Sequence, residues 1–423
     1  MVRLEEHKSL TEHKKIEKIP PADKVYIPLS QHLGRACVPK VAVGDKVALG
    51  QLIASAEAAV YAPIHASVSG KVSAIQEWPH PVLSRCKAIV IENDHEDKTV
   101  DMIARTEEEI EKLSPVEIRK IILEAGVVGM GGASFPTHIK LAPPKKVDTL
   151  IINGAECEPY LTGDYRLMVE KTEEIKKGLA IIAKCLSVKT VYVAIEDNKP
   201  EAIEKFRVDG LGFTVKVLKT QYPQGGEKQL IKNIAGKEIP RGKLPFDIGV
   251  NVQNVSTVLA VYDAVYSSKP LYERVVTVSG SCVSNPKNLL VRIGTPFKDL
   301  VDFCGPLKEE PAKIVSGGPM MGVAQYSFDT PVIKSTTGII LMGAAEVCDA
   351  EELFCVRCGA CVRACPVSLM PTLINLSSQN KRWLEAKMYG AADCIECGCC
   401  SYVCPSHIPL VQSIKRVKME LAK

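Results

Sequence analysis

The strongest constraint on this 423-residue chain is a cysteine pattern that occurs twice near its C-terminal end. The first copy is Cys355-x-x-Cys358-x-x-Cys361-x-x-x-Cys365-Pro366, and the second is Cys394-x-x-Cys397-x-x-Cys400-x-x-x-Cys404-Pro405. This run is typical of proteins that hold two [4Fe–4S] clusters, in which the fourth cysteine of each run ligates the other cluster. The pattern therefore predicts two cubane clusters in one small module.

The spacing assigns each thiol to a cluster. We expect one cluster on Cys355, Cys358, Cys361 and Cys404, and the other on Cys394, Cys397, Cys400 and Cys365. Gly359 and Gly398 stand where the chain must turn tightly, so a positive φ is expected there. Structural zinc sites are the alternative, but they usually show ligand pairs with a longer spacer, which disfavours them. The surplus Cys399 is expected to be a packed thiol.

Composition excludes several other classes of protein. The net charge is only +4, and no basic tract carries interleaved aromatic residues, which argues against nucleic-acid binding. The eight cysteines outside the doubled motif are scattered and lack the spacing of a disulfide framework. The charged first residues do not look like a signal peptide, and no apolar run of about 18 residues occurs. We therefore expect a soluble protein of a reducing cytoplasm, and this composition leaves docking on a membrane complex open.

Changes in pattern divide the chain into five parts and predict a multidomain α/β protein. The expected parts are an extended lead-in (1–24), a barrel-sandwich domain (25–100), an α/β domain (110–270), a small β-grasp domain (271–345) and the cluster module with a final helix (346–423).

Residues 25–100 show short β segments punctuated by glycine, and they resemble the barrel-sandwich fold of biotinyl and lipoyl carrier domains. Those domains carry their cofactor on a lysine at a hairpin tip, which falls here near residues 57–59. No lysine is present there, so covalent attachment at that position is excluded. A carrier would have to use Lys46 or Lys71 instead; a docking or structural role fits the sequence better.

Strands and helices alternate from Ser114 onwards. Ser114, Pro115 and Glu117 predict a capped helix start, and Gly126 predicts its end. The further expected elements are strands at 147–152, 190–195 and 213–218, and helices at 165–185, 200–206 and 227–234. This alternation implies a mostly parallel sheet covered on both faces.

The last third of the chain changes pattern twice. Residues 274–342 are again β-rich and are interrupted by one short helix at 296–303, which suits the β-grasp domain. In the cluster module, residues 371–389 between the two motifs should be helical, and 407–423 should form an amphipathic helix. Packing of that helix on its own protein is favoured over contact with a membrane.

A candidate ligand site lies in the α/β domain. The loop 126–140 contains Gly129-x-Gly131-Gly132, whose backbone N–H groups can approach a phosphate, and Lys140 can add a positive charge. The next strand ends in NGAECEP (153–159), which places an amide and two carboxylates at the C-terminal edge of a parallel sheet, where α/β proteins bind ligands.

These stretches resemble, in the same order, the flavin-carrying subunit of respiratory NADH dehydrogenase. In that family a GRGGAGFPTGxK loop, an NADExEP strand end, a GEE segment and an NNVET segment surround FMN and NADH. A closer resemblance is to the C-subunit family of Rnf electron-transport complexes. It rests on GMGGASFPTHIK, NGAECEPYLTGDYRLM, YPQGGEKQLI, GGPMMG, the N-terminal barrel-sandwich and the doubled cysteine motif.

The resemblance implies a role for nine residues. Contacts to FMN are implied for Gly131, Gly132, Lys140, Asn153, Glu156 and Asn254; contacts to the nicotinamide nucleotide for Phe135 and Glu158; and a place in the same pocket for Glu227. Three positions depart from the NADH dehydrogenase pattern, namely Ala155, Lys228 and Gln253. These departures affect the nucleotide contacts more than the FMN contacts.

The resemblance also implies a function. FMN would exchange a hydride with NAD(H), and single electrons would pass through the two [4Fe–4S] clusters. The chain would be a peripheral subunit of an ion-translocating ferredoxin:NAD+ oxidoreductase on the cytoplasmic face of the bacterial inner membrane. Its partners would be the membrane-embedded and iron–sulfur subunits of that complex, with ferredoxin as an indirect partner.

Two alternatives are retained. One is a cobalamin reductase of the propanediol-utilisation type, in which the glycine-rich loop lies near the start of the chain, whereas here a barrel-sandwich precedes it. The other is a non-catalytic iron–sulfur relay with a vestigial flavin pocket.

Overall fold

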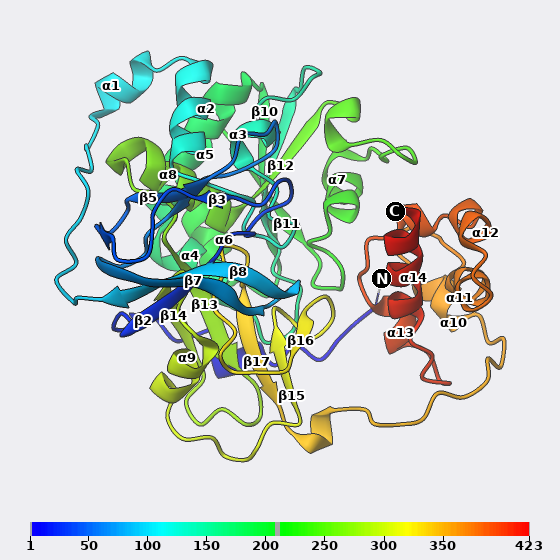
Figure 1. Cartoon of the computed structure of the whole chain (residues 1–423). Coiled ribbons are helices and arrows are strands. Elements are labelled where there is room, and N and C mark those ends of the chain that lie inside the picture. The colour runs from blue at the N-terminus through cyan, green and yellow to red at the C-terminus, as the bar shows by residue number, and fades with distance from the viewer. Residues whose placement is uncertain (1, 208–211, 423) are drawn as a thin grey trace.

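The computed structural model describes residues 2–207 and 212–422. Three parts rich in β-structure form the larger body, and a helical C-terminal module, orange to red in Figure 1, stands at its side. Among the described residues, no helix has both the length and the apolar character needed to cross a bilayer.

Two small sheets form the barrel-sandwich part. Their strand orders are β2-β8-β7-β4 and β3-β5-β6, and alternate residues such as Val25, Ile27, Ile89 and Ile91 fill the space between them. The strands are β2 (Lys24–Pro28), β3 (Val38–Pro39), β4 (Lys46–Val47), β5 (Leu52–Ser55), β6 (Ile64–His65), β7 (Gly70–His80) and β8 (Ser84–Asn93). The turn between β5 and β6 contains the lysine-free tip.

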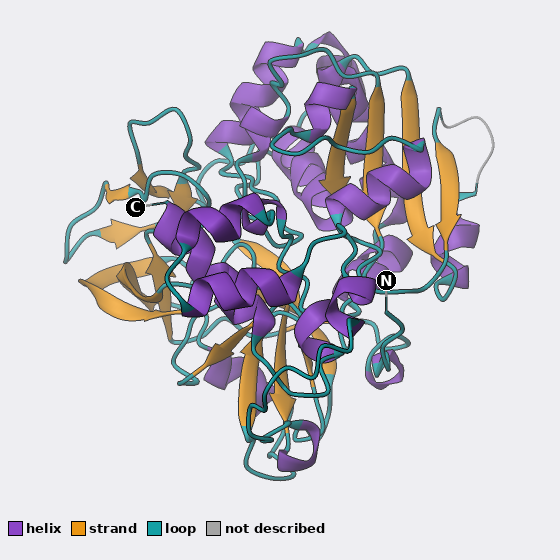
Figure 2. Ribbon diagram, turned by 90° about the vertical axis from the view of Figure 1, so that its right-hand side faces the viewer, coloured by secondary structure: helices purple, strands orange, loops and turns teal. Residues whose placement is uncertain are grey.

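A four-stranded sheet of order β11-β10-β9-β12 organises the α/β part, and every pairing in it is parallel. Ile151 and Val252 face one apolar cluster, whereas Leu150 and Ile152 face another. Both faces are therefore buried, as expected for a parallel sheet, and Figure 2 shows helices on both sides of the strands. The strands are β9 (Thr149–Gly154), β10 (Thr190–Glu196), β11 (Thr214–Leu218) and β12 (Val250–Asn254).

The helices of this part include three that the sequence predicts and four that it does not, namely Glu107–Lys112, Thr137–Lys140, Pro245–Ile248 and Val255–Ser267. In chain order the helices are α1 (Glu107–Lys112), α2 (Pro115–Glu124), α3 (Thr137–Lys140), α4 (Gly163–Glu170), α5 (Thr172–Leu186), α6 (Pro200–Phe206), α7 (Glu227–Ala235), η2 (Pro245–Ile248) and α8 (Val255–Ser267). The capping box of Ser114 and Glu117 starts α2. The single helix expected at 165–185 is wrong: α4 and α5 are separate because Lys171 leaves the helical region at φ −127°.

A six-stranded sheet of order β1-β14-β13-β17-β15-β16 forms the β-grasp part. Its elements are β13 (Glu273–Ser279), β14 (Lys287–Arg292), α9 (Phe297–Phe303), β15 (Lys313–Ser316), β16 (Val323–Gln325), β17 (Gly338–Met342) and η3 (Ala344–Glu346). The N-terminal residues contribute η1 (Lys8–Leu10) and β1 (Ile16–Lys18), and β1 pairs in parallel with β14. These residues are thus more than the extended lead-in that the sequence suggests.

Short helices form the C-terminal module. They are α10 (Ala360–Ala364), α11 (Pro371–Gln379), α12 (Trp383–Met388), η4 (Ala391–Asp393), α13 (Cys399–Tyr402) and α14 (Leu410–Leu421). The single helix expected at 371–389 is wrong, because the chain turns through Lys381 at φ +56° between α11 and α12. Helix α14 buries Ile414 and Val417 against Ile374 and Ala386, so its apolar face packs on its own protein, as expected.

Candidate functional site

The predicted ligand site lies at the C-terminal edge of the parallel sheet. Strands β9 and β12 end side by side there, with Asn153 paired in register with Asn254. The Nδ2 of Asn153 donates to the carbonyl oxygen of Gly225 (2.9 Å), and the Nδ2 of Asn254 donates to Asp164 (2.6 Å). Four segments that are distant in sequence therefore meet at this edge.

The glycine-rich loop lies directly on Asn254. A Cβ at Gly131 would stand 3.1 Å from the Cβ of Asn254. The next residue, Gly132, has φ +127°, and nothing lies within 4 Å of the point where its Cβ would be. A side chain is disfavoured at that φ, and the space beside it is open, so a phosphate group can approach the backbone N–H groups. The loop fits the phosphate-bearing end of a flavin nucleotide.

A partly exposed ion pair stands beside the loop. The Nζ of Lys140 lies 2.8 Å from Oε1 of Glu227, and about a third of each side chain is exposed. The structure thus brings these two predicted site residues together at the start of α7. Phe135 is half-buried, and its carbonyl oxygen accepts a hydrogen bond from the N–H of Gly129.

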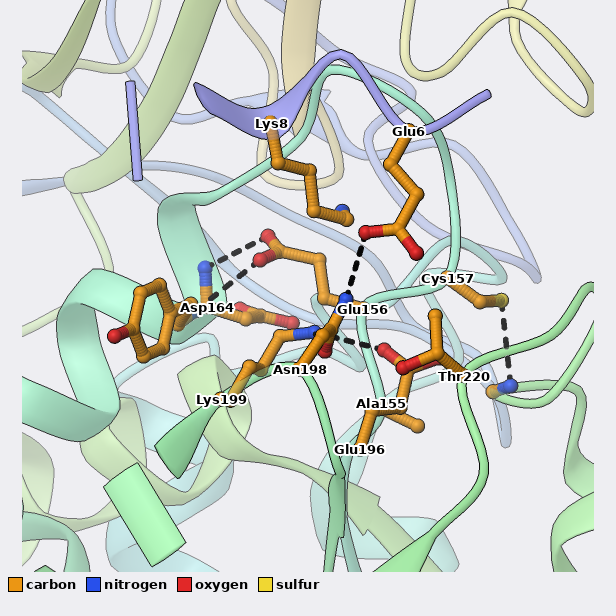
Figure 3. Close-up of polar contacts among 12 residues, drawn as sticks. Glu6, Lys8, Ala155, Glu156, Cys157, Asp164, Glu196, Asn198, Lys199 and Thr220 are labelled. Atoms are coloured by element: carbon orange, nitrogen blue, oxygen red, sulfur yellow. Dashed lines mark hydrogen bonds and ion pairs between the residues drawn. The ribbon is translucent and has the colours of Figure 1, made fainter. Parts of the chain in front are cut away.

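Glu156 holds the start of α4. Its carboxylate accepts hydrogen bonds from the backbone N–H groups of Asp164 (2.9 Å) and Tyr165 (3.2 Å). Figure 3 shows this side chain below Lys8 and Glu6 of the N-terminal segment. Burial raises the pKa of Glu156 to about 7, although Lys8 acts in the opposite direction. This carboxyl is therefore already engaged by the protein.

Three buried charges near this edge were not identified from the sequence. Lys199 and Glu196 form an ion pair of 2.8 Å in which both side chains are almost fully buried. Lys8 is also buried, and its Nζ donates to two backbone carbonyl oxygens of the loop after β9. Glu196 could have been identified from the sequence, because it lies at the C-terminal end of a predicted parallel strand. No local pattern marks Lys8.

Glu158 is covered by the β-grasp part. Its carboxylate accepts hydrogen bonds from the N–H groups of Met320 (3.0 Å) and Met321 (2.9 Å) in the GGPMMG loop. A Cβ at Gly318 would lie 2.2 Å from this carboxylate, so the close approach requires glycine. Burial raises the pKa of Glu158 to about 6. Its predicted contact with a nicotinamide nucleotide therefore competes with this loop.

The two cysteine motifs share one backbone geometry. Gly359 and Gly398 have φ of +72° and +77°, as the sequence predicts. Two further equivalent pairs also have positive φ, namely Arg357 with Glu396 and Ser368 with His407. The buried Cys399 packs beside Tyr222, Ala364 and Cys397 and is a packed thiol, as expected.

The thiols assigned to one cluster are neighbours in the structure. Burial raises the pKa of the Cys400 thiol to about 12, and Cys394, Cys397 and Cys365 act in the same direction. Backbone N–H groups donate to the sulfurs of Cys365 and Cys394 at 3.3 Å each. Such N–H donors to sulfur are one way in which proteins tune bound clusters. This set fits a cubane in the predicted crossed pairing.

The second set is more open. Cys361 and Cys404 line one small apolar cluster, whereas Cys355 and Cys358 are exposed on an irregular segment. Within residues 2–207 and 212–422, no three His, Cys, Asp or Glu side chains converge closely enough for a single metal ion.

Comparison with known sequences assigns each part. The models of four families match, by their descriptions, the RnfC barrel sandwich hybrid domain (2–96), the Nuo51 FMN-binding domain (122–263), the SLBB domain (275–324) and the 4Fe-4S dicluster domain (354–408). The C subunit of the proton-translocating ferredoxin:NAD(+) oxidoreductase complex of Clostridium ljungdahlii is 50% identical, over 99% of this chain and 93% of that protein. This chain belongs to the C-subunit family of Rnf complexes.

Other members of the C-subunit family agree. The C subunit of the Na(+)-translocating ferredoxin:NAD(+) oxidoreductase complex of Acetobacterium woodii is 44% identical over 94% of this chain and 91% of its own length. The C subunit of the ion-translocating oxidoreductase complex of Rhodobacter capsulatus is 45% identical over 99% of this chain and 82% of its own length. Membership in this family confirms the predicted fold class, and it disfavours both the cobalamin reductase and the simple relay.

Proposed function

We propose that this chain exchanges electrons between NAD(H) and iron–sulfur centres as the flavin-containing C subunit of an ion-translocating ferredoxin:NAD+ oxidoreductase. One observation carries the proposal. The edge of the FMN-binding domain is in direct hydrogen-bond contact with the dicluster module, because the Tyr222 hydroxyl donates to the carbonyl oxygen of Cys397 at 2.8 Å. Bound FMN supplies the conversion between a two-electron hydride and single electrons.

The chain's own residues bind and orient the flavin in this proposal. The N–H groups around Gly131 and Gly132 and the ammonium of Lys140 meet the phosphate, while Asn153 and Asn254 offer amides from the strand ends. Lys140 is paired with Glu227 here, so binding a phosphate means exchanging one anionic partner for another. Glu156 acts by holding α4 in place, Phe135 faces the nicotinamide, and Glu227 shares the pocket. Glu158 meets the nucleotide by exchanging its contacts with the N–H groups of Met320 and Met321.

Eight thiolates hold the clusters in the crossed arrangement. Cys394, Cys397, Cys400 and Cys365 form the set that lies against the FMN-binding domain, and Cys355, Cys358, Cys361 and Cys404 form the more exposed set. The exposed set suits electron exchange with another iron–sulfur protein of the complex, with ferredoxin as the more distant partner. We place the protein peripherally on the cytoplasmic face of the bacterial inner membrane, beside the membrane-embedded subunits.

Anaerobic reconstitution of the full chain tests this function. We expect stoichiometric FMN, two [4Fe–4S] clusters, and bleaching of both chromophores when NADH is added. A protein with iron but without FMN would favour the relay, and NADH-dependent reduction of an added cobalamin would favour the cobalamin reductase. Material that stays oxidised in NADH would contradict the proposal.

A further inference from the structure

The segment Val2–Lys8, here called the N-terminal strap, runs from the C-terminal module to the FMN-binding domain. In Figure 1 it is the blue segment that reaches the orange-to-red helices. We infer that the strap and Tyr222 form a clamp that fixes the turn bearing Cys397 against the FMN-binding domain. The inference rests on the proposed function only for the groups that the two domains bind, FMN in one and the clusters in the other.

The first end of the strap pairs with Tyr222 of the FMN-binding domain and packs beside the C-terminal module. The N–H of Val2 donates to the carbonyl oxygen of Tyr222, and the N–H of Tyr222 donates back to Val2, each at 2.9 Å. Val2 and Leu4 also pack on the apolar cluster that contains Tyr222, Cys397 and Cys399. This end therefore touches both domains at once.

The other end of the strap is anchored on the FMN-binding domain. The carbonyl oxygen of Glu6 accepts from the N–H of Tyr160 (2.8 Å), and its carboxylate accepts from Asn198 (2.9 Å). The His7 ring stacks on Tyr160 at 4.6 Å between centroids. Lys8 is buried, so the two carbonyl oxygens that its ammonium meets are needed to offset its desolvation.

Tyr222 is a buried link between the FMN-binding domain and the C-terminal module. Its side chain is 1% exposed, and its hydroxyl lies 2.8 Å from the carbonyl oxygen of Cys397 and 3.4 Å from Oε1 of Glu158. Two further contacts join the domains beside α7, namely Gln229 with Pro366 (3.2 Å) and Arg241 with Asp393 (3.8 Å). Tyr222 is thus the buried contact that links a ligand-bearing turn to the flavin side.

The clamp has two physical consequences. The protein's part in electron transfer is to fix the positions of the redox groups, so a loose module would slow transfer. Dipoles and hydrogen bonds around the ligands also set the potential of a cluster. The Tyr222 hydroxyl directs its positive end toward the peptide of Cys397 and favours the reduced state. Tyr222 is therefore a positioning residue rather than a catalytic one.

Tyr222→Phe tests the second consequence while preserving the packing. In the full, reconstituted chain, a redox titration followed by electron paramagnetic resonance should show one cluster shifted to lower potential. The other cluster and the FMN content should be unchanged. Tyr402→Phe is the matched control, since Tyr402 lies in the cluster module and its side chain is exposed.

Leu4→Ser tests the strap, with Arg3→Ala as the control because Arg3 is exposed on the same strap. In Leu4→Ser alone, we expect the clusters to be reduced by NADH at least tenfold more slowly. We also expect faster protease cleavage within 347–359, the segment that connects the β-grasp part to the C-terminal module, because a loosened module exposes it further. Wild-type potentials in Tyr222→Phe together with wild-type cleavage in Leu4→Ser would overturn the clamp. Absence of FMN or iron from the wild-type protein would instead count against the proposed function, and the cleavage comparison would still decide the clamp.

Discussion

At the scale of single residues, several charged groups with little exposure to water lie at the C-terminal edge of the FMN-binding sheet. Lys199 and Glu196 are almost fully buried, and Glu156 and Lys8, the last residue of the strap, lie near them, as Figure 3 shows. A buried charge is costly without a partner, so each of these groups depends on the others.

Lys199→Met should reveal this dependence. The substitution leaves the Glu196 carboxylate buried without its cation, and we expect a loss of about 3–5 kcal/mol in the free energy of unfolding. Chemical denaturation measures it, and adding Glu196→Gln should recover much of the loss. Lys24→Met, which breaks the exposed pair with Glu92, should change little. Equal effects of the two lysine substitutions would contradict the assignment.

Glu156 should make stability depend on pH. Its pKa is raised from the ordinary 4.5 to about 7, so the folded state binds this proton more tightly than the unfolded chain does. The stabilising contribution is therefore complete below pH 4.5 and is lost as the pH rises through 7. Glu156→Gln should flatten the fall in the free energy of unfolding between about pH 5 and pH 8, by on the order of 1–3 kcal/mol, as measured by chemical denaturation at each pH. The exposed Glu201→Gln should keep the wild-type slope.

At the scale of elements, local sequence signals predicted those helices whose ends are set by residues within the same segment. Helix α6 spans Pro200–Phe206, the range that its proline and apolar spacing predict, and α2 begins at the expected capping box. The break between α4 and α5 was missed because no glycine or proline marks Lys171; there the Thr172 hydroxyl donates to the Met168 carbonyl oxygen. Among the site residues, the family resemblance, rather than a local signal, indicated that the segments of Asn153 and Asn254 belong to one site, and these two residues are paired in register.

What the sequence did not reveal depends on distant contacts. The strap has no periodicity, and Lys8 is buried only because the loop after β9 supplies its partners 150 residues away. Likewise, the coverage of Glu158 by the GGPMMG loop joins two domains. Such contacts leave no local trace, because each partner looks like an ordinary surface residue in its own segment.

The glycine-rich loop allows a sharp comparison within one element. Gly132→Ala places a Cβ at φ +127°, so the loop must change its conformation, and we expect at least a tenfold weaker affinity for FMN. Gly129→Ala is the control, because its Cβ would make ordinary contact with the Phe135 carbonyl oxygen at 3.5 Å. Fluorescence titration with FMN measures both. Equal FMN affinities of the two variants would indicate that the phosphate binds elsewhere.

The crossed ligand pairing can be tested between the two motifs. Cys365→Ser and Cys394→Ser should remove the same cluster and about half of the iron, since both belong to one predicted set. Cys404→Ser should remove the other cluster, and Cys399→Ser should retain both. Iron analysis with electron paramagnetic resonance distinguishes the two clusters. If Cys365→Ser instead abolished the signal that Cys355→Ser abolishes, the crossed pairing would be wrong.

At the scale of the whole molecule, the barrel-sandwich is joined to the flavin site through a buried lysine, Lys334. The Nζ of Lys334 donates to the carbonyl oxygens of Pro63 (2.6 Å) and Gly126 (2.7 Å). Pro63 ends the turn between β5 and β6, Gly126 begins the glycine-rich loop, and Lys334 comes from the β-grasp part. The hairpin whose tip carries a lysine in carrier domains is therefore connected to the glycine-rich loop at its base.

Lys334→Met should loosen this junction. Two buried carbonyl oxygens lose their hydrogen-bond donor, at a cost of roughly 1–3 kcal/mol for each group. We expect faster hydrogen exchange in residues 126–138 and near residue 63, with weaker FMN binding as a result. The exposed Lys308→Met, in the same part of the chain, should leave exchange at the wild-type rate. Unchanged exchange in Lys334→Met would contradict the coupling.

The repeated left-handed positions of the two cysteine motifs carry one more consequence. Because both turns follow the same path, their redox centres can differ only through what surrounds the shared backbone, including the side chains placed on it. Arg357 occupies in one turn the position that Glu396 holds in the other, and Glu396 is itself paired with Lys418 at 2.6 Å. Two turns of similar backbone conformation can therefore hold unequal electron carriers, because their side chains differ in charge and in charged partners.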